Sequence, residues 1–190
     1  PLHVVCVADT AAGPRMSHPR LVVLAGPGSR ATVVVSHLGA AEGTHLTNAV
    51  THVVLEEGAA LELCQLQDEA ASATHVALVQ VRAGRGSCFT SHSLALGASS
   101  ARHEVLVRLE AEGAEVCLNG LYFADGERRL DNLTTIEHVA PHCTSRELYK
   151  GIATGRGRGA FDGRIIVHPG AFKTDASQSN QNLLLSESAG

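Results

Sequence analysis

Residues 51–67 read THVVLEEGAALELCQLQ, and this stretch decides the fold class. Two short runs rich in Val, Leu and Ala, His52–Leu55 and Ala60–Leu66, flank the dipeptide Gly58-Ala59. Short runs of β-prone residues bounded by turn residues are typical of strands. Glycine suits the corner between them because it tolerates a positive φ. The stretch therefore predicts a strand, a tight corner and a second strand.

The same strand–corner–strand unit recurs along the chain. Its corner dipeptides are Gly28-Ser29, Gly58-Ala59, Gly86-Ser87, Gly113-Ala114 and Gly170-Ala171. The glycines are separated by 30, 28 and 27 residues and then by 57, which equals two steps with one glycine missing near Pro141-His142. A repeat of this length indicates a solenoid. We predict an all-β fold, a single-stranded parallel β-helix with coils of roughly 28 residues; a β-sandwich is the alternative.

Further runs with strand composition lie along the whole chain. They are His3–Ala8, Arg20–Leu24, Ala31–His37, His75–Val81, Glu104–Leu109, Glu115–Phe123 and Arg164–His168. A helical period is nearly absent, and Thr144–Ile152 is the best segment for a helix. We expect one β-helix core domain over residues 1–190. Because the chain starts at Pro1 rather than at Met, we also expect it to be part of a longer protein.

The composition excludes several classes of protein. Hydrophobic residues make up 44% of the chain, which excludes a disordered protein. Only 3% is aromatic, which favours a core of small and β-branched side chains. No apolar run is long enough to span a bilayer. The formal net charge of −4 gives no bulk attraction to nucleic acid or to an anionic membrane, so neither is an expected partner.

The chain contains five cysteines and no secretory signal. An odd count without a Cys-x-x-Cys pair is typical of reduced thiols in an intracellular protein, so we expect a cytoplasmic location. Cys64, Cys88 and Cys117 lie at different distances from their corner glycines and do not form one column. We interpret them as small buried hydrophobic residues.

Residues 155–160, Gly-Arg-Gly-Arg-Gly-Ala, contain the loose spacing of a dinucleotide-binding loop. Such a loop has to open a helix whose N-terminus faces the pyrophosphate. No helical pattern follows here, so the segment is interpreted as a basic turn between two coils.

His138, His142 and Cys143 combine nitrogen and sulfur ligands that zinc, copper or iron accept. On one extended strand the two histidines would share a face, and Cys143 would point to the other face. A partner or another coil would then have to complete the site. His142 and Cys143 are therefore candidate metal ligands. The alternative is an interior thiol beside surface imidazoles.

Asp162, Arg164, Lys173 and Asp175 are acidic and basic residues near the C-terminal end. A β-helix polysaccharide lyase or hydrolase could use such a group, and this enzyme is the alternative function. The chain has no Trp on which a sugar ring would stack, and the G-x-S-x-G nucleophile motif is missing. No catalytic residues are therefore assigned.

A long tract of the second half matches a known family. Its segments are Gly120–Gly126, Leu130–Asn132, Glu137-His138, Pro141–Cys143, Ser145–Gly151, Gly159–Ile165, Gly170–Ala176 and Asn180–Ser186. The tract resembles the SufB/SufD family, the scaffold subunits of the Suf iron–sulfur cluster assembly system. The run from Pro141 to Gly151 is more similar to SufD members. Residues 1–119 resemble the family through their strand–corner–strand units alone.

The resemblance implies a parallel β-helix core in a non-enzymatic scaffold. In this family SufB and SufD pair through their β-helix cores, and each binds the ATPase SufC through a C-terminal helical segment. The expected partners are therefore a SufB-like subunit and the SufC ATPase, with a homodimer as a further state of the isolated core. No stably bound cofactor is expected, and an iron–sulfur cluster would be present transiently at the partner interface. In a photosynthetic eukaryote the location would be the plastid stroma.

The chain departs from the family pattern in three respects. The family's short Cys/His stretch, to which cluster formation is attributed, lies beyond the Asn-Leu-Leu-Leu tract, and this sequence stops at Gly190. The flanking helical regions are absent, so we expect a core truncated at both ends. Leu133 stands where the family usually has a His. His142 and Cys143 match family positions, with turn or packing roles as the alternative to metal binding.

Overall fold

A computed structural model describes residues 1–11, 13–39 and 43–190. The described residues form strands and turns and contain no helix. The strands are β1 (Leu2–Ala8), β2 (Arg15–Ser17), β3 (Arg20–Ala25), β4 (Arg30–Gly39), β5 (His45–Leu55), β6 (Ala60–Asp68), β7 (Thr74–Ala83), β8 (Cys88–Ala95), β9 (Ser100–Leu109), β10 (Glu115–Ala124), β11 (Arg129–His138), β12 (Thr144–Ala153), β13 (Arg158–Val167) and β14 (Asp175–Leu184).

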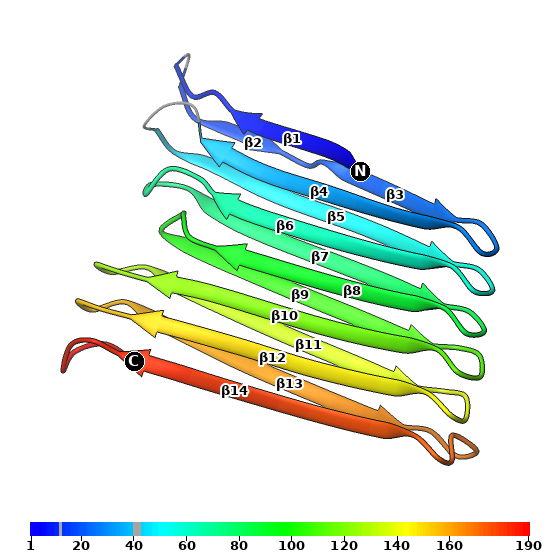
Figure 1. Ribbon diagram of the computed structural model, residues 1–190. Helices are drawn as coiled ribbons and strands as arrows, with labels where there is room; N and C mark the ends of the chain where they lie inside the picture. Colours follow the sequence, from blue (N-terminus) through cyan, green and yellow to red (C-terminus); the bar gives the residue numbers. More distant parts are fainter. Residues whose placement is uncertain (12, 40–42) are drawn as a thin grey trace.

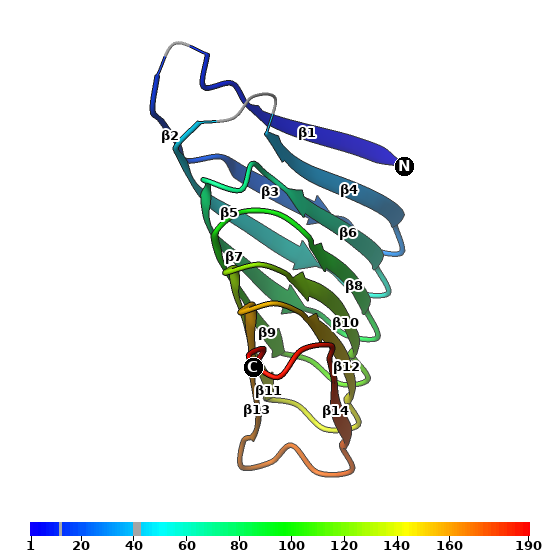
Figure 2. The same ribbon diagram turned by 90° about the vertical axis from the view of Figure 1, so that its left-hand side faces the viewer.

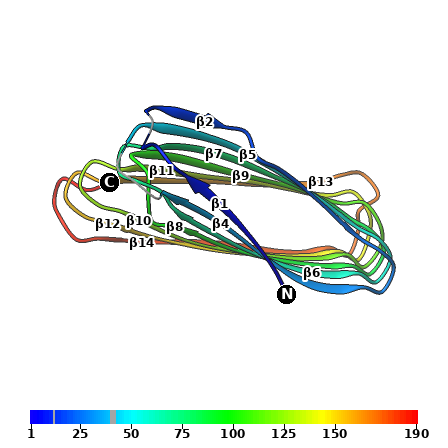
Figure 3. The same ribbon diagram turned by 90° about the horizontal axis from the view of Figure 1, so that it is seen from above.

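The strands stack into two parallel sheets that face each other (Figures 1 and 2). Sheet A has the order β1-β4-β6-β8-β10-β12-β14, and sheet B the order β13-β11-β9-β7-β5-β2, with β3 also paired to β5. Each coil contributes one strand to each sheet, and seen from above the coils superpose as flattened loops (Figure 3). The chain makes about six turns with a spacing of roughly 29 residues, which confirms the predicted parallel β-helix.

One set of turns joins each sheet B strand to the next sheet A strand, and its corner residues form a ladder. The corner residues have a positive φ and are Gly28, Gly58, Gly86, Gly113 and His142. Each donates its backbone N–H to a carbonyl one coil further on, as Gly58 does to Arg85 at 2.8 Å. Glycine recurs here because a side chain is disfavoured in the left-handed region. His142 occupies the corner at which the sequence lacks a glycine.

The sixth corner differs from the prediction. Lys173, with φ 56°, holds the corner position, and the predicted corner Gly170 lies earlier in the same turn. The register establishes this, because Thr144 pairs with Asp175 and the N–H of His142 donates to the carbonyl of Phe172. This turn is wider than the preceding ones, so counting glycines misplaced the corner.

Thr144–Ile152 was the best segment for a helix in the sequence, and this prediction is wrong, because the segment forms strand β12. Its inward positions include Ser145 and Glu147, so the apolar alternation that marks a strand is missing. Its Arg, Glu, Leu and Lys content favours a helix locally, and pairing with β10 and β14 overrides that preference. Strands β8, β11 and β14 were not predicted either, because polar residues at their inward positions also interrupt the apolar alternation.

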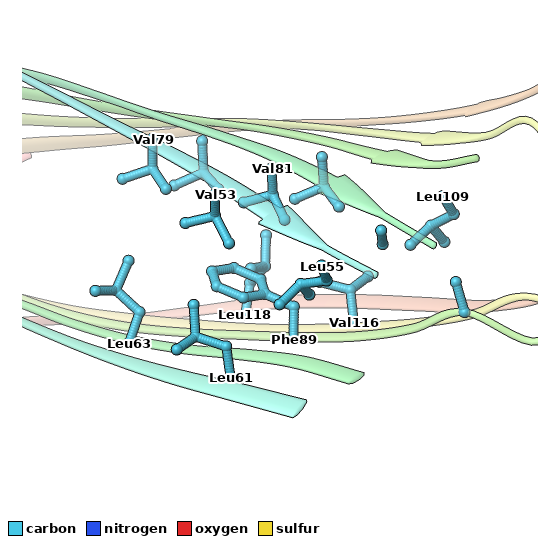
Figure 4. Packing of buried hydrophobic residues seen from close by; sticks show 14 of the residues in the cluster. Val53, Leu55, Leu61, Leu63, Val79, Val81, Phe89, Leu109, Val116 and Leu118 are labelled. Atoms are coloured by element: carbon cyan, nitrogen blue, oxygen red, sulfur yellow. The ribbon is translucent and has the colours of Figure 1, made fainter. Parts of the chain in front are cut away.

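The interior is apolar at the end of the coils that lies beside the corner ladder. Aliphatic side chains from both sheets interdigitate there with Phe89 (Figure 4). The labelled members are Val53, Leu55, Leu61, Leu63, Val79, Val81, Phe89, Leu109, Val116 and Leu118. Small β-branched and leucine side chains stack over their counterparts one coil away, as the low aromatic content led us to expect.

Candidate functional site

The corner at His142 and Cys143 places these two residues in different environments. The His142 ring is partly exposed, with Nε2 3.9 Å from Glu112 Oε1. Cys143 is fully buried, and its thiol donates a hydrogen bond to the carbonyl oxygen of Ala111 at 3.4 Å. Burial raises the pKa of the Cys143 thiol, so the thiol and not the metal-binding thiolate is present at neutral pH. Metal binding by these two residues stays a prediction.

His138 lies inside the protein and does not share an outer face with His142. It is the last residue of β11, is fully buried, and its Nε2 lies 2.9 Å from Ser145 Oγ. The strand ends at His138, so a single alternating strand through residue 143 does not exist. The interpretation of His138 as a surface imidazole is wrong.

The four charged residues proposed for polysaccharide chemistry are all exposed to solvent. Asp162 and Arg164 face outward from β13, whereas Lys173 lies in the following turn and Asp175 begins β14. No ion pair joins any two of these four described residues. The arrangement supplies no enclosed site for a sugar chain.

The interpretation of Cys64, Cys88 and Cys117 as buried residues is wrong. All three are half-buried on the outer face of sheet A, because they occupy the phase opposite to inward residues such as Leu63. The absence of a common column is confirmed, since the register pairs Cys64 with His92 and not with Cys88.

Residues 155–160 form the turn that was predicted and the beginning of β13. Gly155 has φ 66°, and Arg158 starts the strand directly after the turn. The Arg156 guanidinium pairs with the carboxylate of Glu127 in the turn of the preceding coil. Gly155 and Gly157 thus lie at a corner between coils, Gly159 lies within β13, and no helix follows them in the described part of the chain.

A buried carboxylate with four polar partners lies inside the N-terminal coils, and the sequence-based predictions did not include it. Glu69 is 4% exposed. Its Oε1 accepts a hydrogen bond from the Thr47 hydroxyl at 2.5 Å and lies 3.1 Å from His45 Nε2. Its Oε2 accepts from the Gln67 amide at 3.1 Å and lies 2.7 Å from His75 Nδ1. The carboxylate is thereby held between both sheets.

These contacts set the charge of the cluster. Burial alone would raise the pKa of Glu69. The hydrogen bond and charge of His75, and the hydrogen bonds from Thr47 and Gln67, outweigh burial and lower the pKa to about 2. The pKa of His37 and of His103 is lowered to about 4, first by burial and then by neighbouring histidines. At neutral pH the cluster therefore contains an ionised carboxylate beside neutral His37 and His103.

One signal in the sequence marks these residues as inward-facing. His75 shares the period-2 phase of Ala77, Val79 and Val81 in β7, which are all buried. The phase of an apolar strand therefore places the ring inside. Which other polar groups meet it cannot be read from the phase, since His45 and Glu69 come from other coils.

A second buried carboxylate lies in the C-terminal coils. Glu147 is also 4% exposed, and burial raises its pKa more than the nearby Thr134 hydroxyl lowers it. Neither carboxylate oxygen reaches a partner in full hydrogen-bond geometry. This glutamate belongs to the Ser145–Gly151 run of the sequence motif.

The glycines and tyrosines of that motif pack against one another across coils. A Cβ built on Gly120 would overlap the Tyr149 ring, and one built on Gly151 or Gly159 would overlap the Tyr122 ring. The Tyr149 ring also stacks on Phe161 with 4.7 Å between ring centroids. The motif glycines thus make room for two large rings inside thin coils.

The described residues contain no group of three or more His, Cys, Asp and Glu side chains that could hold a metal ion. Several motif residues among them, such as Gly120, Tyr149 and Gly151, pack inside the coils, and His142 shapes a corner between coils. Fold and interior together define a parallel β-solenoid module.

Comparison with known families identifies the module. A family model described as the SUF system FeS cluster assembly, SufBD core domain, matches residues 6–190. The chain belongs to this family. The resemblance seen in the sequence from Gly120 onward therefore extends over the N-terminal coils as well.

Three curated relatives illustrate the range of similarity. The iron–sulfur cluster assembly protein SufD of Escherichia coli (strain K12) is 29% identical over 191 residues, which cover 100% of this chain and 45% of that protein. SufBD family proteins of Mycobacterium leprae and of Synechocystis are 30% and 25% identical, over 82% and 100% of this chain and 40% and 44% of their own lengths. The chain thus spans less than half the length of these relatives.

The described residues form no helix that is long and apolar enough to cross a bilayer.

Proposed function

We propose that the chain is the β-helix core of a SufD-like, non-enzymatic scaffold subunit in iron–sulfur cluster assembly. The observation that carries the proposal is the family match over residues 6–190, with SufD of Escherichia coli similar along the whole chain. The use of Gly120, Tyr149 and Gly151 for packing supports it, because these motif residues build the scaffold itself.

We further propose that the chain pairs with a SufB-like subunit and works with the SufC ATPase, in the cytoplasm or a plastid stroma. Strands β1 and β14 support pairing, since each has one edge without a strand partner in the described part of the chain. Such edges readily accept another strand, including that of a second copy. The iron–sulfur cluster is cargo in this proposal, formed transiently at the subunit interface and not held stably by this chain.

Affinity purification of the full-length protein, co-expressed with the SufB-like and SufC proteins of its own organism, tests the proposal. We expect both to co-purify with it. Failure to retain either one, under conditions in which the SufB-like protein and SufC still bind each other, would exclude the scaffold function.

Edge pairing has its own test with a matched control. Ser177→Lys with Gln181→Lys adds two charges to the edge strand β14, and Val76→Lys with Gln80→Lys adds two to the outer face of the central strand β7. We expect only the β14 variant to weaken binding of the SufB-like protein, by about tenfold or more. Equal weakening by both variants would contradict edge pairing and leave the scaffold function standing.

A further inference from the structure

The outer face of sheet A, the sheet nearer the viewer in Figure 1, carries a contiguous apolar patch. Leu94 on β8 and Leu121 on β10 are register neighbours and are 39% and 38% exposed. Leu148 on β12 is 39% exposed and is the register neighbour of Asn119, two residues before Leu121. The half-buried Leu66 on β6 continues the row beyond Leu94. We call Leu66, Leu94, Leu121 and Leu148 the leucine patch.

An open hollow of about 230 Å³ lies over this patch. Its lining includes Leu94, Leu121 and Leu148, and the described residues that complete it include Lys150 and no acidic residue. The volume is several times the share of about 30 Å³ that one water molecule occupies in the liquid. The hollow is therefore large enough to receive an apolar side chain of a binding partner.

Two cations stand on either side of Leu148 along β12. Arg146, Leu148 and Lys150 are all exposed, and alternate residues of a strand share one face. Neither Arg146 nor Lys150 forms an ion pair with a described residue. Their register neighbours on β10 are Cys117 and Leu121, and those on β14 are uncharged as well. The patch is thus bordered by positive charge that the protein itself leaves unpaired.

The outer face of sheet B in the same coils is different. Its charges are paired with one another, as Arg108 is with Glu137 at 3.2 Å and Arg102 with Glu104 at 3.7 Å. Single exposed apolar residues are normal at a protein surface, whereas contiguous ones mark interaction sites. The leucine patch is contiguous over four strands, so it is the face that favours contact with a partner.

The hydrogen bonding of the sheet decides which kind of partner fits. Strands β8, β10 and β12 each have a partner strand along both edges, so their backbone groups are used within the sheet. An extended segment laid on this face would leave its own backbone N–H and C=O groups without partners from the sheet. An α-helix pairs these groups internally and presents apolar side chains along one stripe. The occupant that fits is an amphipathic helix.

We propose that the leucine patch is a docking surface for an acidic amphipathic helix of a partner protein. The helix places large apolar side chains against Leu94, Leu121 and Leu148, and its carboxylates pair with Arg146 and Lys150. Burial of the apolar stripe drives association, and the charge pairs select the partner. The patch lies on a sheet face and not on the edge of β14, so this docking goes beyond the proposed scaffold function and does not depend on it.

Photocrosslinking in the cells of its own organism tests the proposal on the full-length protein. A photoreactive amino acid in place of Leu121 reports what covers the patch. One in place of Val76 is the matched control, because Val76 is also 38% exposed but lies on the outer face of sheet B. We expect only the Leu121 position to crosslink to another protein, at a segment that mass spectrometry identifies as helical in period and rich in Asp or Glu.

Three results of this experiment would overturn the proposal. They are equal crosslinking at both positions, no crosslink at Leu121, and a crosslink at Leu121 to any other segment, including one of the same chain.

Charge reversal adds a readout that proximity alone does not give. Arg146→Glu with Lys150→Glu should lower the crosslink yield at Leu121 by about tenfold or more, because carboxylates then face carboxylates. Arg146→Lys with Lys150→Arg keeps both charges and should preserve the yield. All four substitutions concern exposed side chains, so the fold should persist, which thermal melting checks. An unchanged yield after charge reversal would overturn the proposal.

Co-purification of the SufB-like protein and of SufC, measured with the same variants, separates the two proposals. We expect both proteins to be retained by the charge-reversed variant. Their absence already with the unmodified protein would contradict the scaffold function and leave the docking surface to be decided by the crosslinks.

Discussion

Two glutamates with the same burial differ in the direction of their pKa. Glu69 in the N-terminal coils and Glu147 in the C-terminal coils are each 4% exposed. The pKa of Glu69 is lowered to about 2, whereas that of Glu147 is raised. Burial opposes ionisation of both, so the partners decide the difference. Four polar side chains surround the Glu69 carboxylate, and Glu147 has the Thr134 hydroxyl.

The two regions fill the interior differently. The N-terminal coils use imidazole and amide side chains, which surround the Glu69 carboxylate. The C-terminal coils use the Tyr122 and Tyr149 rings over glycines, which fill space with few donors. Burial and the charge of Glu147 in turn raise the pKa of Tyr149. One backbone architecture thus accepts a polar and an aromatic interior in successive coils.

The largest effect is expected from removing the Glu69 carboxylate. Glu69→Ala leaves His45, His75 and Thr47 without their common partner and should lower the free energy of unfolding by about 3 kcal/mol or more. Urea denaturation of the full chain measures the change. Glu62→Ala is the control, because that glutamate is exposed and its contact with His92 contributes about 0–1 kcal/mol. A loss at Glu69 no larger than at Glu62 would contradict the assigned network.

The N-terminal interior should also make the fold acid-labile. The pKa of His37 and of His103 is lower in the folded state, so the unfolded chain binds more protons and stability falls as pH drops from about 6.5 to about 4. The depressed pKa of Glu69 adds a loss from about pH 4.5 to 2. Full protonation of each histidine would lower the free energy of unfolding by on the order of 3 kcal/mol.

Thermal melts between pH 7 and pH 4 measure this dependence, and the variant His103→Asn should flatten it. A melting temperature that stays constant over that range would contradict the buried, neutral state of the two histidines. Glu147 acts in the opposite direction: its raised pKa contributes stability that is present at low pH and lost as pH rises through the folded value.

The aromatic packing of the C-terminal coils predicts a moderate effect. Gly120→Ala places a methyl group where the Tyr149 ring lies and should cost about 1–3 kcal/mol. Gly26→Ala is a matched control, because a Cβ there meets only a Glu56 side-chain oxygen at 4.0 Å. Calorimetry of both variants compares them. If the pair Gly120→Ala with Tyr149→Leu is no more stable than the sum of its single losses predicts, the overlap is not the cause.

The smallest expected effect is a gain. Glu147→Gln replaces a poorly solvated carboxylate by a neutral amide of the same shape and should raise the free energy of unfolding at neutral pH by about 1 kcal/mol. The same substitution at Glu69 should lower it. If both substitutions change stability in the same direction, the contrast between the two carboxylates is wrong.

Much of the fold was predictable because corners repeat. The glycine spacing identified the coils, and the gap near Pro141-His142 was filled by His142 at a left-handed corner. The misassigned segment 144–152 shows the limit of this approach. Ser145 and Glu147 face inward, so neither the apolar period nor the local propensity marked the strand, and only pairing with β10 and β14 decided it.

The site was less predictable, because its members come from different coils. His142 and Cys143 are adjacent at one corner, yet the His142 ring is partly exposed and Cys143 is buried. His45, Glu69 and His75 are far apart in sequence yet touch. Contacts of this kind depend on the register between coils, which varies by a few residues from step to step.

By itself the sequence determined the solenoid and the family, since glycine corners and alternating apolar residues impose coils whatever their partners are. The tertiary structure alone decided which polar side chains meet inside and therefore which are charged. The physical reason is that a pKa depends on the donors within a few ångström of a group. In stacked coils those donors come from the neighbouring turn, about 29 residues away in the chain.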